Sequence, residues 1–87
     1  MPQEMTTWRA REIARPHQGP PGTADPIRRF VATGEIAPAL LAELCDAQDG
    51  RYIEGNLEDW DRLDGLIEYV REAGPRPAVP GWPWAAP

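Results

Sequence analysis

The sequence predicts a small all-α domain, either a helical hairpin or three short helices, with extended proline-rich arms at its N and C termini. Apolar residues recur at helical spacing between residues 25 and 74, and no stretch requires a β-strand. Proline and glycine gather in the flanking segments. We therefore divide the chain into a flexible or partner-wrapping N-terminal arm (1–24), a small helical domain (25–74) and an extended Pro/Trp-rich C-terminal tail (75–87).

The first expected helix covers residues 26–33. Asp25 is a preferred N-cap residue, and Pro26 suits the first helical position. Gly34 is a natural stop, because glycine readily adopts the left-handed conformation that ends helices. The apolar residues of this helix follow at i, i+3 and i+4 spacing and are Ile27, Phe30 and Val31.

The second expected helix covers residues 38–47, and the turn signal Asp49-Gly50 is expected to end it. Residues 51–55 then form a short linker. Cys45 is the only cysteine of the chain, and its place on the apolar stripe of this helix predicts a core thiol. The other members of the stripe are Leu40, Leu41 and Leu44.

The third expected helix begins after the N-cap residue Asn56 and ends at Gly74-Pro75. Gly65 weakens its middle by about 1 kcal/mol relative to alanine, which a close helix crossing at that point would explain. The apolar stripe repeats at three- and four-residue spacing and contains Leu57, Trp60, Leu63, Ile67 and Val70.

The N-terminal arm is poor in large apolar residues, although residues 8–15 can form two helical turns, for example on binding. Two interpretations follow. The arm is either a disordered tail or a segment that wraps a partner, with Trp8 and Ile13 as its anchors.

The C-terminal tail carries Trp82 and Trp84 among closely spaced prolines. Proline interrupts helices and sheet ladders, so the tail is expected to be extended. Its two indoles can each bury about 150–250 Å². They either fold back over helices of this chain, onto Trp60 or Tyr69 for example, insert into a groove of a partner protein, or remain disordered.

Acidic residues share one face of the third helix, and their negative charges outnumber the positive charges of the nearby arginines. This face either keeps the protein soluble as a solvated surface or binds an arginine-rich or nucleic-acid-binding partner. The residues are Glu58, Asp61, Asp64, Glu68 and Glu72.

Several classes of function lack support in the sequence. One cysteine and one histidine cannot supply a zinc site, the chain has no serine, and no glycine-rich loop follows a strand. We therefore expect no catalytic residues, no cofactor, no metal ion and no small-molecule substrate. Nucleic acid is not an expected partner either, because the net charge is −5.

The expected location follows from two observations. No apolar run approaches the ~20 residues of a membrane span, and a single thiol suits a reducing compartment. The sequence therefore predicts a cytoplasmic or virion protein without membrane contact.

These observations predict a non-enzymatic protein–protein interaction protein, an accessory or structural subunit of a larger assembly that uses its terminal arms as anchors. A minor virion or phage-assembly component is one setting that this layout suits. The alternative is a small acidic inhibitor that blocks a nucleic-acid-binding enzyme through the acidic face of the third helix. The partner-binding residues predicted for one or the other function are Trp8, Ile13, Trp82, Trp84, Glu58, Asp61, Asp64 and Glu68.

Overall fold

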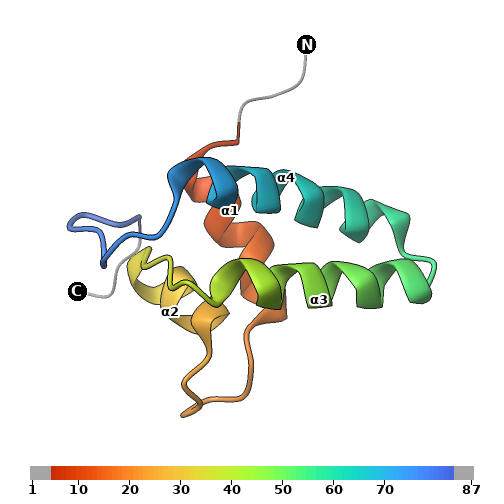
Figure 1. Ribbon diagram of the computed structural model, residues 1–87, viewed down its shortest axis with the longest axis horizontal. Helices are drawn as coiled ribbons and strands as arrows, with labels where there is room; N and C mark the ends of the chain where they lie inside the picture. Colours follow the sequence, from red (N-terminus) through yellow and green to blue (C-terminus); the bar gives the residue numbers. More distant parts are fainter. Residues whose placement is uncertain (1–4, 84–87) are drawn as a thin grey trace.

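The computed structural model describes residues 5–83, and within them it confirms the all-α fold (Figure 1). The helices are α1 (Thr7–Ala14), the 3₁₀ helix η1 (Arg15–His17), α2 (Pro26–Thr33), α3 (Leu40–Ile53) and α4 (Leu57–Ala73). The two long helices, α3 and α4, run side by side as a hairpin, and α1 and α2 pack against it near the N-terminal end of α3 (Figure 1). The opposite end of the hairpin, where α3 turns into α4, projects beyond α1 and α2.

Capping residues place α2 and α4 where the sequence predicts them. The Asp25 side chain accepts a hydrogen bond from the backbone N–H of Ile27, and Gly34 ends α2 at φ 78°. Asn56 caps α4 by accepting from the backbone N–H of Asp59. Both caps satisfy backbone donors that have no partner within the helix, so these boundaries follow from local chemistry.

The predicted end of α3 is wrong. The helix continues through Asp49-Gly50 to Ile53, and the turn occurs at Gly55, whose φ is 76°. A glycine inside a helix costs about 1 kcal/mol of stability. The hydrogen bonds of the added helical turn and its packing against α4 outweigh that cost. Residues 51–53 are therefore helical rather than a linker, and the hairpin is longer than expected.

The N-terminal segment differs most from its prediction, because residues 7–17 belong to the packed domain. Ala10 and Ala14 of α1 are fully buried, and α1 contacts both α2 and α4. Alanine contributes little to an apolar pattern, but its small side chain lets a helix approach its neighbours closely. The largest fully buried side chains of the core come from the other helices and are Phe30, Leu40, Leu44, Leu63 and Leu66.

Other sequence expectations are corrected by the packing of individual side chains. The helical spacing predicts Leu57 on the apolar stripe of α4, but its side chain is 60% exposed. It lies at the end of the hairpin, where no other element covers it. Gly65 meets the Met5 side chain rather than a crossing helix, since a Cβ atom there would lie 2.9 Å from Met5 Cε. Cys45 is only partly buried, at the edge of the core.

Candidate protein-binding surfaces

Trp82 is buried against α2 of its own chain and is 2% exposed. Its ring meets the Phe30 ring edge to face, with the centroids 5.3 Å apart. The indole Nε1–H donates a hydrogen bond to the Val31 carbonyl oxygen over 3.0 Å. Trp82 therefore completes the core and cannot anchor a partner in this structure. The expectation that the tail folds back over helices of this chain is confirmed for Trp82. Its ring packs on Phe30, and Tyr69 lies on the same side, since Arg76 faces both rings. Trp84 lies outside the described residues.

The rest of the described tail is held at the C-terminal end of α2. The backbone N–H of Val79 donates to the Thr33 carbonyl over 2.8 Å, and Arg76 forms an isolated antiparallel bridge with Ile36. The Arg76 guanidinium also donates to the Gly34 carbonyl over 3.0 Å. Since the last carbonyls of a helix lack partners within it, the tail acts as a cap for α2.

Two arginines reinforce this cap from opposite ends of the chain. Arg11 of α1 donates through Nε to the Val31 carbonyl over 3.0 Å, the same oxygen that Trp82 contacts. The Arg76 guanidinium lies 5.6 Å from the Trp82 ring centroid and 5.8 Å from that of Tyr69. Cations are favourable near the negative C-terminal end of a helix, so α1, α2 and the tail form one connected unit.

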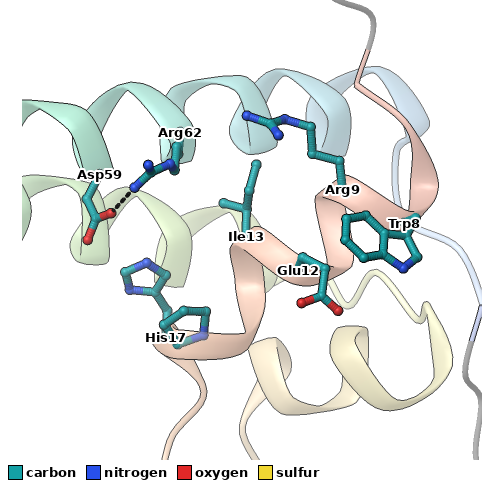
Figure 2. A pocket seen from close by; sticks show the side chains of 8 residues that line it. Trp8, Arg9, Glu12, Ile13, His17, Asp59 and Arg62 are labelled. Atoms are coloured by element: carbon teal, nitrogen blue, oxygen red, sulfur yellow. Dashed lines mark hydrogen bonds and ion pairs between the residues drawn. The ribbon is translucent and has the colours of Figure 1, made fainter.

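Trp8 and Ile13, the two predicted anchors in the N-terminal segment, both line a groove between α1 and the first half of α4 (Figure 2). The groove has a volume of about 290 Å³. Trp8 is 47% exposed, whereas Ile13 is partly buried against the core. The remaining lining residues are Arg9, Glu12, Pro16, His17, Asp59 and Arg62.

Three charged residues that line this groove form ion pairs, with one another or with arginines beside the groove. Arg62 pairs with Asp59 over 2.9 Å, and Glu12 pairs with Arg15 over 3.2 Å and with Arg11 over 3.3 Å. Among residues 5–83, no group of three or more His, Cys, Asp or Glu side chains is placed to hold a metal ion. The groove therefore presents paired charges beside the apolar side chains of Trp8 and Ile13.

His17 makes the stability of this region pH-dependent. Burial lowers the pKa of its imidazole from 6.5, Arg51 lowers it further, and Asp59 opposes the shift. The unfolded chain thus takes up a proton at a higher pH than the folded chain, so stability falls as the pH drops below about 6.5 toward the lowered pKa. We expect His17→Gln to lose less thermal stability than the wild type between about pH 7 and about pH 5.5. Circular dichroism melts at the two pH values test this, and equal losses in both proteins would contradict it.

The four predicted acidic residues lie on the exposed side of α4, opposite its buried stripe. Glu58 pairs with Arg62 over 3.0 Å and Glu68 with Arg71 over 2.8 Å. Asp64 accepts a hydrogen bond from the Gln48 side chain over 3.3 Å. Asp61 is also exposed. We call the surface formed by Glu58, Asp61, Asp64 and Glu68 the acidic face.

An exposed apolar cluster lies at the turn between α3 and α4, where the sequence predicts only a short linker. Tyr52, Ile53 and Leu57 are 65%, 83% and 60% exposed. With Trp60 they form what we call the hairpin tip, and Tyr52, Leu57 and Trp60 line a hollow of about 470 Å³ together with Glu58 and Asp61. The adjacent apolar pair Tyr52-Ile53 is the only sign of this cluster in the sequence.

Known proteins give no information on the fold or function of this chain. No family model, no curated protein and no solved structure matches the chain. Between residues 5 and 83, none of the helices combines the length and the apolar character that crossing a membrane requires.

Proposed function

We propose that the protein is a non-enzymatic protein–protein interaction protein, an accessory or structural subunit of a larger assembly. The observation that carries this proposal is the hairpin tip, because clustered exposed apolar side chains mark interaction sites more than isolated ones do. In the groove of Figure 2, Asp59 is paired with Arg62, and Glu12 is paired with Arg11 and Arg15 beside the groove. These pairings favour binding over acid–base chemistry. We place the assembly in the cytoplasm or in a virion, since the single thiol suits a reducing compartment.

The location of the anchors is revised in this proposal. The terminal arms were expected to grip the partner, but Trp82 is buried in the protein's own core. Trp8 and Ile13 line a groove on the folded domain and remain candidates as part of that surface. The hairpin tip and the groove thus replace the arms as the proposed contact surfaces.

A second candidate function is a small acidic inhibitor of a nucleic-acid-binding enzyme. The acidic face favours it, because four carboxylates lie exposed along one side of α4. Such binding rests on exposed charge and therefore weakens steeply as salt rises. An assembly contact through apolar side chains tolerates salt.

One charge-reversal experiment separates the two functions. The full chain is used to capture proteins from the cells that make it, and each captured protein is purified and titrated back. The variant Asp61→Lys/Asp64→Lys/Glu68→Lys is compared with Glu43→Lys/Asp46→Lys/Asp49→Lys, which changes the net charge equally on exposed positions of α3. The assembly function predicts that binding persists in both variants and in about 0.5 M salt, because apolar contacts carry most of it. The dissociation constant should rise by less than about a hundredfold in the α4 variant and by less than about threefold in the α3 variant.

Each other outcome has a defined meaning. A captured nucleic-acid-binding enzyme that is inhibited by the wild type and released by the α4 variant alone establishes the inhibitor. Binding that survives that variant excludes the inhibitor. If no purified protein binds with a dissociation constant below about 100 μM, the interaction function itself is overturned.

A further inference from the structure

The hairpin tip gathers most of the large apolar side chains that are exposed within residues 5–83. Tyr52, Ile53 and Leu57 are three of the four large apolar residues found exposed in that range, and the fourth, Trp8, lies elsewhere. A single exposed apolar residue is ordinary, whereas a cluster around a hollow is typical of a binding surface.

The fold does not need these side chains at the tip. The turn residue Gly55 has no neighbouring atom within 4 Å of the position that a Cβ would take, so the tip is open. The hairpin is held together further along by Leu44 and Leu63, which are fully buried. Because the tip projects beyond α1 and α2 (Figure 1), its apolar side chains add little to the core and are available to a partner.

Acidic residues surround this apolar cluster. Residues 49–62 contain five acidic side chains and two arginines, so the net charge of this segment is −3. Arg51 pairs with Glu54 over 3.4 Å, and Arg62 pairs with Glu58 and Asp59. Both arginines are thereby occupied, and the surplus charge that remains is negative.

The apolar and acidic surfaces are continuous along α4. Leu57, Asp61, Asp64 and Glu68 follow one another at intervals of four, three and four residues, which places them on one helical face. A segment lying along this face would meet apolar surface at the tip and carboxylates beyond it. A second copy of this chain would instead bring acidic residues against acidic residues, and an anionic membrane surface would repel the tip.

We propose that the hairpin tip docks an amphipathic, arginine- or lysine-rich helix of a partner protein. Apolar side chains of that helix fill the hollow lined by Tyr52, Leu57 and Trp60. Its basic side chains lie opposite the acidic face, beginning at Asp61. This mode resembles other helix-in-groove contacts, in which apolar residues at helical spacing act as anchors. The inference rests on the proposed interaction function and names the chemistry of the partner.

A synthetic helix of this chemistry tests the inference on the full chain. The probe is a peptide of about 18 residues with leucine on one helical face and arginine on the other, titrated into isotope-labelled protein and followed by NMR. We expect the amide shifts to concentrate at residues 52–61. Two control peptides are a scrambled sequence of the same composition and an amphipathic leucine/glutamate peptide, both of which should bind at least about tenfold more weakly.

Variants of the protein locate the contact. Ile53→Ser and Leu57→Ser should each weaken binding about tenfold, and Asp61→Lys should weaken it about threefold to tenfold. Glu43→Lys changes the net charge equally but lies in the first turn of α3, away from the tip, and should leave the affinity unchanged. Circular dichroism melts verify that all four variants fold.

Several results would overturn the inference. They are amide shifts centred on the groove of Figure 2, equal effects of Glu43→Lys and Asp61→Lys, equal binding of the leucine/glutamate peptide, or a doubling of mass in light scattering that Leu57→Ser abolishes. A natural partner that binds the wild type and the tip variants equally refutes the tip as its docking site while leaving the interaction function intact.

Discussion

Replacing Trp82 by alanine is expected to lower the free energy of unfolding by about 3–5 kcal/mol. The side chain is almost fully buried, packs on Phe30 and donates a hydrogen bond to the Val31 carbonyl. A domain of this size has a total stability of about 4–13 kcal/mol. The loss is therefore a large fraction of that stability and should leave the variant partly or wholly unfolded at 37 °C.

Urea unfolding followed by circular dichroism measures this effect. Trp82→Phe keeps an aromatic ring but loses the N–H donor, and should cost about 1–2 kcal/mol, because the Val31 carbonyl still accepts from Arg11. Tyr52→Ala is the matched control at an exposed aromatic residue and should change stability by less than about 0.5 kcal/mol. A midpoint for Trp82→Ala equal to that of Tyr52→Ala would show that the tail does not stabilise the domain.

Gly34→Ala is expected to have the second large effect, for two separate reasons. Gly34 has φ 78°, a conformation that costs an L-residue about 1–2 kcal/mol. A Cβ atom there would also lie 2.5 Å from Trp82 Cε3 and 2.7 Å from Cδ2, so the indole ring must leave its position. We expect a total loss of about 3–5 kcal/mol, because the displaced ring forfeits the packing that Trp82→Ala removes.

A matched glycine separates the two reasons. Gly55 has φ 76° with open space around its Cα, so Gly55→Ala reports the backbone cost alone, about 1–2 kcal/mol. In a double-mutant cycle, Gly34→Ala made in the Trp82→Ala background should cost no more than Gly55→Ala. If its cost is undiminished when the indole is absent, the clash is not the cause.

The docking of Trp82 explains how so short a chain forms a closed core. Small domains bury a limited fraction of their surface, and here the core draws on α1 and on the tail as well as on the three expected helices. Val31 of α2 joins the two flanks, since its carbonyl oxygen accepts hydrogen bonds from Arg11 of α1 and from Trp82 of the tail. Because both flanks are part of the domain, the exposed hairpin tip becomes the more informative surface for function.

Local signals predicted what local chemistry controls. Asp25 and Asn56 as N-caps and Gly34 and Gly74 as stops located α2 and α4 correctly, and the 3.6-residue period placed the acidic residues on the exposed side of α4. The same signals failed at Asp49-Gly50, where a pair typical of turns lies within α3. Keeping Gly50 in a helix costs about 1 kcal/mol relative to alanine, and tertiary packing outweighs that cost.

By itself, the sequence determined the all-α class, the caps of two helices, the acidic face and the extended, proline-interrupted tail. Only the tertiary structure decided that α1 packs through Ala10 and Ala14, that Trp82 lies on Phe30 and Gly34, and that Tyr52, Ile53 and Leu57 remain exposed. The reason is that caps and helical periods depend on residues within about four positions of one another. Which apolar side chains are covered depends on segments that meet from opposite ends of the chain, such as Val31 and Trp82.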